Sequence, residues 1–94
     1  MSIFVVISPM PSNTKLQATI KEKYPNDYYE LHQNQWLVSS EGTTRELSEA
    51  LGINDKNAAK YTGPAIVFAI SSYWGRANTD IWEWLKVNWE KSVE

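Results

Sequence analysis

The sequence predicts a single α+β domain that spans residues 1–94. Two apolar, β-branched runs lie far apart in the chain, at residues 3–7 and 65–70, and indicate buried strands. Three other segments have apolar residues at helical spacing, and each begins with a capping residue. With 94 residues, 43% of them hydrophobic, the chain has enough apolar side chains for one core and too few for two.

The first half of the chain predicts a strand, a helix and a hairpin. Residues 3–7 are continuously apolar, which is typical of a strand covered on both faces. Ser12 is the expected N-cap of a helix, which ends before Pro25 because the residue before a proline is pushed away from α geometry. Residues 28–32 and 36–39 are rich in strand formers and flank a polar turn, so they predict a β-hairpin.

The second half predicts a helix, a loop, a strand and a final helix. Thr43 and the glutamate three residues later have the spacing of a capping box, and Gly52 is the expected left-handed terminator. Residues 54–64 lack periodicity and are expected to form a mobile connection. Residues 65–70 predict a second fully buried strand. Asp80 then opens a helix that is rich in tryptophan.

The order of elements, β-α-β-β-α-β-α, begins with the six elements of a ferredoxin-like βαββαβ sandwich. That topology places the first and last strands side by side, with two helices on one face of the sheet. Both of those strands are apolar on both faces, so another layer has to cover the second face. The additional C-terminal Trp-rich helix is the expected cover, through Trp82, Leu85 and Trp89, and a second copy of the chain is the alternative.

Composition and charge narrow the classes of function. The formal net charge is −2, from nine basic and eleven acidic side chains, so the chain has no overall basic character for nucleic acid. The absence of cysteine excludes disulfides and thiolate zinc sites. His32 is the one histidine, and we expect neither a metal site nor a cofactor. Without a signal-peptide pattern or a long apolar run, we expect a cytoplasmic protein that does not enter membranes.

No set of catalytic residues emerges, since the nucleotide-binding glycine motifs and the zinc-protease motif are absent. The segment 71–79 is the strongest candidate for function, because binding residues concentrate on loops held by a rigid scaffold. Its aromatic and arginine side chains are types that dominate protein interfaces. The structural alternative is that one of its aromatic rings packs as a lid on the core. The candidate binding residues are Tyr73, Trp74, Arg76 and Asn78 of this segment, with Lys56 and Lys60 of the preceding loop.

The first strand also resembles a nucleic-acid-binding motif. Residues 3–8, Ile-Phe-Val-Val-Ile-Ser, look like the first-strand ribonucleoprotein motif of RNA-recognition domains, which share the βαββαβ order. The resemblance implies that Phe4 is a base-stacking ring. The third-strand motif of that family is missing, because residues 34–40 lack its basic-glycine-aromatic start.

We therefore expect a small, non-enzymatic binding or regulatory module that acts by protein–protein contact, with a protein partner or as a homodimer. One alternative is a nucleic-acid-binding domain that uses the sheet face or the 71–79 loop. The other is a small enzyme that holds a substrate anion at the N-terminus of the last helix.

Overall fold

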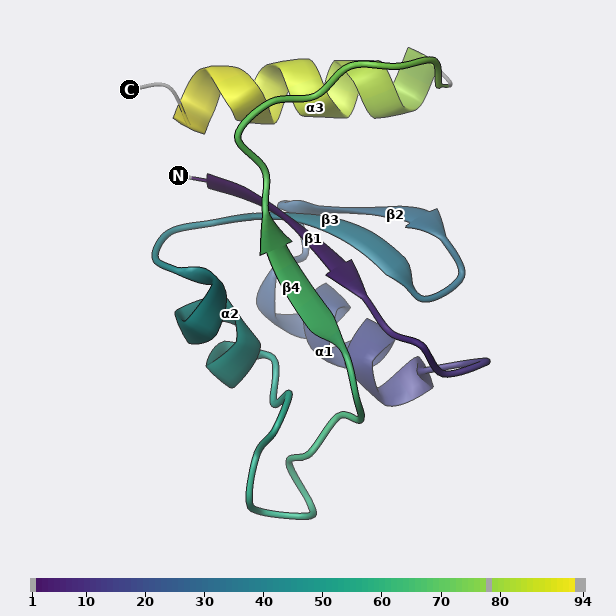
Figure 1. Cartoon of the computed structure of the whole chain (residues 1–94), viewed down its shortest axis with the longest axis vertical. Coiled ribbons are helices and arrows are strands. Elements are labelled where there is room, and N and C mark those ends of the chain that lie inside the picture. Colours follow the sequence, from purple (N-terminus) through teal and green to yellow (C-terminus); the bar gives the residue numbers. More distant parts are fainter. Residues whose placement is uncertain (1, 78, 93–94) are drawn as a thin grey trace.

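The computed structural model describes residues 2–77 and 79–92, which form a small α+β structure with a four-stranded antiparallel sheet (Figure 1). The elements follow the order expected from the sequence. In chain order they are β1 (Ser2–Ile7), α1 (Thr14–Lys23), β2 (Tyr28–His32), β3 (Gln35–Ser40), α2 (Thr44–Ala50), β4 (Ile66–Ala69) and α3 (Thr79–Ser92).

The strands lie in the order β2-β3-β1-β4. β1 pairs with β4, with Phe4 opposite Ala69 and Ile7 opposite Ile66, so the first and last strands are neighbours as predicted. β2 and β3 form the predicted hairpin. Its turn contains Asn34, whose φ of 64° is a left-handed conformation that asparagine tolerates better than most residues. β2 and β4 are the two edges of the sheet.

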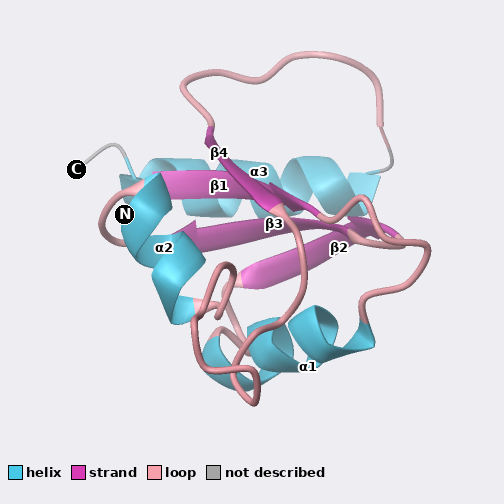
Figure 2. Cartoon of the chain, turned by 60° about the horizontal axis from the view of Figure 1, so that its bottom comes forward, coloured by secondary structure: helices cyan, strands magenta, loops and turns pink. Residues whose placement is uncertain are grey.

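The sheet separates two layers of helices (Figure 2). α1 and α2 cover one face, and α3 lies on the other (Figure 1). On the second face Leu85 of α3 packs with Ile3 and Leu37 of the sheet. The C-terminal helix is thus the cover that the sequence predicted, through Leu85 and Trp89 as expected but with Trp84 in place of Trp82. The core between the sheet and the first two helices consists of Phe4, Val6, Leu16, Ile20, Trp36, Val38, Leu47, Leu51 and Ile53.

α1 begins one residue later than predicted, with Asn13 and not Ser12 as its N-cap. The Oδ1 atom of Asn13 accepts a hydrogen bond from the Leu16 N–H at 3.0 Å. Asn13 also donates its backbone N–H to Asn34 Oδ1 at 2.8 Å and its side-chain amide to Ser8 Oγ at 3.1 Å. An asparagine side chain both donates and accepts here, so tertiary contacts with the hairpin turn select Asn13 as the cap.

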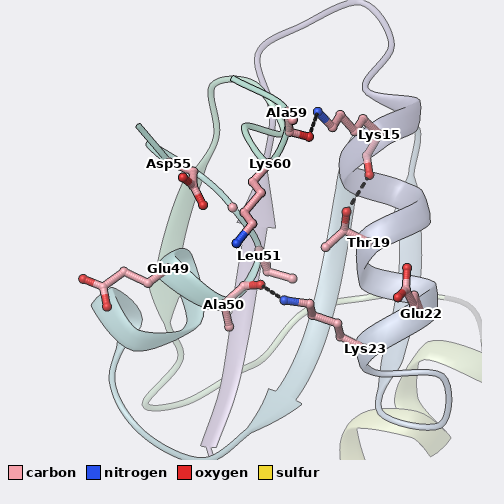
Figure 3. Close-up of a pocket in the computed structure, with 11 residues that line it drawn as sticks. Lys15, Thr19, Glu22, Lys23, Glu49, Ala50, Leu51, Asp55, Ala59 and Lys60 are labelled. Carbon is pink, nitrogen blue, oxygen red and sulfur yellow. Dashed lines mark hydrogen bonds between the residues drawn. The ribbon is translucent and has the colours of Figure 1, made fainter. Parts of the chain in front are cut away.

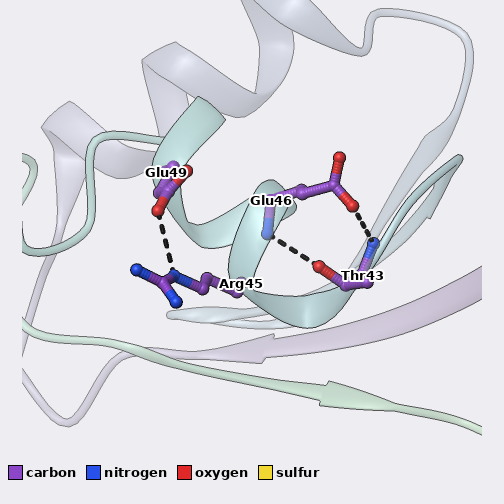
Figure 4. A network of polar contacts seen from close by, with 4 residues as sticks. All are labelled: Thr43, Arg45, Glu46 and Glu49. Atoms are coloured by element: carbon purple, nitrogen blue, oxygen red, sulfur yellow. Dashed lines mark hydrogen bonds and ion pairs between the residues drawn. The ribbon is translucent and has the colours of Figure 1, made fainter.

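α2 begins with the capping box that the sequence predicted (Figure 4). Thr43 Oγ1 accepts from the Glu46 N–H at 3.1 Å, and Glu46 Oε1 accepts from the Thr43 N–H at 3.1 Å. Arg45 and Glu49 form an ion pair at 3.3 Å on the exposed face of the same helix. Each of the two bonds of the box satisfies a backbone donor that helix geometry leaves unpaired.

α2 ends at the predicted glycine terminator. Gly52 has a φ of +79°, and its N–H donates to the Glu49 carbonyl at 3.1 Å while the Ile53 N–H donates to the Ser48 carbonyl at 3.0 Å. These two bonds are those of a Schellman motif. A Cβ atom at position 52 would lie 2.4 Å from the Lys60 carbonyl oxygen, so the approach of the following loop also requires glycine.

The loop of residues 54–64 is held against the body of the protein at several points. Thr62 is buried, donates its hydroxyl to the Leu51 carbonyl at 2.9 Å and donates its N–H to the Gly52 carbonyl at 3.1 Å. Lys15 of α1 reaches the loop from the other side and donates to the Ala59 carbonyl at 2.8 Å. These bonds attach the middle of the loop to α1 and its C-terminal end to the end of α2.

The prediction that residues 65–70 form a fully buried strand is wrong. β4 is the edge strand Ile66–Ala69, and Ile66 and Phe68 are 59% and 49% exposed. They lie on the α3 face, because they pair with Ile7 and Val5 of β1. α3 packs over β1 and β2 instead, so this part of the face stays open. A continuous apolar run has the same pattern at the edge of a sheet as in its centre. The pattern alone therefore could not show that this strand lies at an edge.

Candidate functional site

The two adjacent aromatic residues of the loop that joins β4 to α3 lie in different environments. The ring of Tyr73 is half-buried, with its centroid 5.5 Å from that of Trp82 and 5.1 Å from that of Trp89. Tyr73 therefore packs as a lid on the cluster of Ile3, Leu37 and Leu85. Trp74 is 95% exposed, and its ring meets the ring of Trp82 edge to face at 6.2 Å.

The rest of this loop is open to solvent. Arg76 is exposed, and Gly75 has open space around the position of a Cβ atom. Asn78, the fourth candidate of the segment, lies outside the described residues. A hollow of about 150 Å³ lies between the loop and α3, and it is lined by Tyr73, Trp74, Gly75, Arg76, Ala77, Trp82 and Leu85.

Further exposed apolar side chains lie on β4 and beside it. Ile66 and Phe68 of β4 and Ile7 of β1 share the α3 face, and Ile7 is 37% exposed. Figures 1 and 2 both show the loop of residues 70–77 on the side of the molecule where β4 forms the edge of the sheet. We group Trp74 of this loop with Ile7, Ile66 and Phe68 as exposed large apolar residues, and call the four residues the β4 surface.

The two lysine candidates lie elsewhere. Their loop, residues 54–64, is at the end of the molecule opposite the 70–77 loop in both views. The six predicted binding residues therefore do not form one site. Lys56 is exposed, and Lys60 faces a different hollow. The sequence prediction grouped them because loop residues were the candidates, and it had no information on where each loop lies.

That second hollow has a volume of about 310 Å³ and lies between α1, the end of α2 and the 54–64 loop (Figure 3). Lys60 lines this hollow together with Lys15 and Lys23 of α1. Both α1 lysines donate to backbone carbonyl groups, those of Ala59 and Ala50. Glu22, Glu49 and Asp55 line the same hollow. Its lysines are matched by carboxylates, so the hollow has no surplus positive charge with which to hold a phosphate.

The geometry does not favour the other two modes of binding. Phe4 is 1% exposed and packs against α1 and α2, so it is not available to stack on a base. α3 begins at Thr79 with Asp80 in its first turn, and that carboxylate disfavours an anion at the same helix end. Among the described residues, no group of three or more His, Asp or Glu side chains is placed to hold a metal ion.

None of the helices within residues 2–77 and 79–92 combines the length and the apolar character needed to cross a membrane. Comparison with known protein families, with curated proteins and with solved structures finds no match to this chain.

Sequence reasoning singled out Trp74 but missed the apolar residues of β4 that lie on the same side of the molecule. A signal for them is present in the sequence. No charged residue occurs between Lys60 and Arg76, although this stretch contains the edge strand and most of an exposed loop. Surface segments ordinarily include charged side chains, so a long uncharged stretch at an edge indicates a surface that is covered by something else.

Proposed function

We propose that this protein is a small, non-enzymatic binding or regulatory module that acts by protein–protein contact through the β4 surface. The observation that supports this best is the nearly complete exposure of Trp74, together with the exposure of Ile66 and Phe68. At about 200 Å² for each large apolar side chain, the four residues expose roughly 500 Å² in total. We propose that they act as one surface, since apolar surfaces of this size on small proteins commonly mark interaction sites.

The environment of Trp74 suits a binding residue. Its neighbour Tyr73 is wedged between Trp82 and Trp89, so the base of the loop is anchored to α3. The base of the loop is thus ordered before binding, which reduces the conformational entropy that is lost when a partner covers Trp74. Arg76 stands two residues away and supplies a charged contact at the margin of the surface.

We also propose that the fold is a ferredoxin-like sandwich extended by α3. The strand order β2-β3-β1-β4 and the position of α1 and α2 on one face support this assignment. The fold does not indicate the function, because this topology carries many unrelated activities. The proposed function rests on the β4 surface alone.

The test is a capture experiment with purified, tagged protein from native lysate, with and without nuclease treatment. Wild type is compared with a Trp74→Ser/Arg76→Ser variant and with a control, Val87→Ser. Val87 is 53% exposed on α3 and belongs to a different hollow, beside Tyr29 of β2, so the control removes an exposed apolar side chain away from the β4 surface. Circular dichroism establishes that all three proteins are folded.

We expect a protein that wild type and the Val87→Ser control retain and that the double variant loses. Equal capture by all three proteins would show that the β4 surface is not the binding site. Captured material that disappears with nuclease would instead support the nucleic-acid alternative. In that case its affinity has to fall steeply with salt concentration, because phosphate contacts release counterions.

A further inference from the structure

The free edge of β4 has backbone groups that no strand pairs within the described part of the chain. The Ile70 N–H donates to the Ile3 carbonyl at 3.0 Å. In an antiparallel ladder the hydrogen-bonded pairs alternate, so Phe68 and Ile66 also direct their backbone groups toward β1. Val67 and Ala69 therefore direct their N–H and C=O groups away from β1, at the edge of the sheet.

β4 is a short edge strand of four residues, which itself limits strand pairing, but it lacks the other usual protections. Charged side chains, bulges and prolines within the strand are the usual protections. β4 contains none of them, and its pairing with β1 is regular. The opposite edge differs, since β2 includes Glu30 and its pairing with β3 is irregular between Glu30 and His32. Of the two edges, β4 is the one suited to accept another strand.

We propose that the occupant of this edge is a second copy of the chain, paired antiparallel through β4 about a twofold axis. This inference rests on the proposed function and names the partner. An uncharged edge is self-complementary, because pairing it with itself brings no like charges together. Pairing β4 with β2 of another copy would instead leave a free edge at each end and extend into an open array, whereas β4 with β4 closes as a dimer.

The side chains of β4 fit this arrangement. Two registers of the new strand pair have a twofold axis and join the outward backbone groups. One register is centred on Val67 and the other on Phe68, and in both the N–H of Ala69 forms a hydrogen bond with the second copy. In one register Phe68 lies opposite Phe68 of the second copy, and in the other it lies opposite Ile66. In both cases the exposed side chains of β4 meet across the new strand pair on the α3 side of the joined sheet.

The area available is sufficient for a dimer of modest affinity. The side chains of Ile7, Ile66 and Phe68 expose roughly 300 Å² in each copy. Two copies then bury roughly 600 Å² of apolar side chain in addition to the backbone of the new strand pair, which corresponds to a weak interface. We therefore expect a dissociation constant in the micromolar range, on the order of 1–100 μM.

The test is sedimentation equilibrium of the full chain over about 1–500 μM, a range that brackets the expected dissociation constant. Two variants address the edge. Phe68→Lys places a positive charge from each copy in the middle of the new strand pair. Ala69→Pro removes an N–H that makes no bond within the chain, and edge strands tolerate proline at such positions. Val87→Lys is the matched control, since it places the same charge on an equally exposed apolar position of α3.

Wild type and Val87→Lys are expected to dimerise, and each edge variant is expected to weaken the dimer at least about 100-fold. A wild type that stays monomeric at the highest concentration overturns the inference, as does a dimer that neither edge variant weakens. If circular dichroism shows that one edge variant is unfolded, the other variant alone tests whether the dimer forms through β4. A monomeric wild type that still captures a different protein through Trp74 refutes the dimer and leaves the proposed function standing; a monomer that captures nothing refutes both.

Discussion

Replacing each of the adjacent aromatics Tyr73 and Trp74 by alanine should have very different effects on stability. Tyr73 loses two ring contacts, with centroids at 5.5 and 5.1 Å, each worth about 0.5–1.5 kcal/mol beyond area burial. With the apolar area of a half-buried ring added, we expect Tyr73→Ala to lower the free energy of unfolding by about 2–4 kcal/mol.

Trp74→Ala should cost much less. At 95% exposure the side chain buries roughly 10 Å², which corresponds to about 0.3 kcal/mol. The single edge contact with Trp82 at 6.2 Å adds a similar amount at an exposed position, so the total should stay below about 1 kcal/mol.

The assay is urea unfolding followed by far-ultraviolet circular dichroism, because tryptophan fluorescence changes with the substitution itself. The chain is small and has no cysteine, so a reversible two-state transition is the expected behaviour. Equal losses for the two variants, or a larger loss for Trp74→Ala, would refute the assignment of Tyr73 to the core and Trp74 to the surface.

Four further substitutions test the local structure through the same unfolding measurement. Asn13→Ala should cost about 2 kcal/mol or more, because it removes a cap and leaves a buried network incomplete, whereas Ser12→Ala should change little. Gly52→Ala should cost at least about 2 kcal/mol, since φ is +79° and the new Cβ would meet a backbone oxygen at 2.4 Å; a neutral result would show that this turn relaxes easily. Arg45→Ala should change stability by less than about 0.5 kcal/mol at any salt concentration, because the side chains of its ion pair with Glu49 are 88% and 66% exposed; a larger, salt-sensitive loss would contradict this.

The parts of the fold that could be predicted from the sequence are those that depend on residues close together in the chain. The capping box at Thr43, the terminator at Gly52 and the polar turn at Asn34 each depend on residues a few positions apart. Ser12 was predicted as a cap because local rules cannot distinguish it from Asn13. The bonds from Asn13 to Ser8 and Asn34 decide between them, and the bond to Asn34 joins segments that are distant in the chain.

The candidate site was predicted in part for the same reason. The residue types around Trp74 indicated an interface, but which of two adjacent rings faces solvent depends on the direction in which the loop leaves β4. The exposure of Ile66 and Phe68 depends on the place of β4 at an edge, which strand order decides and apolar patterning does not. Lys60 lines a hollow with Lys15 and Lys23 of α1, a neighbourhood that its position in the sequence does not reveal.

The position of α3 explains why this protein has an apolar edge at all. Two helices on one face leave the second face of the sheet apolar, and Leu85 with its neighbours covers that face only over the strands away from β4. A helix placed one strand nearer to β4 would have covered Ile66 and Phe68 and exposed Tyr29, which instead packs against Trp84 at 6.4 Å. One helix is too narrow to cover four strands, because neighbouring strands are about 4.8 Å apart and a helix is about 10 Å wide. Part of the second face had to remain open, and it remains open at the strand whose edge carries no charge.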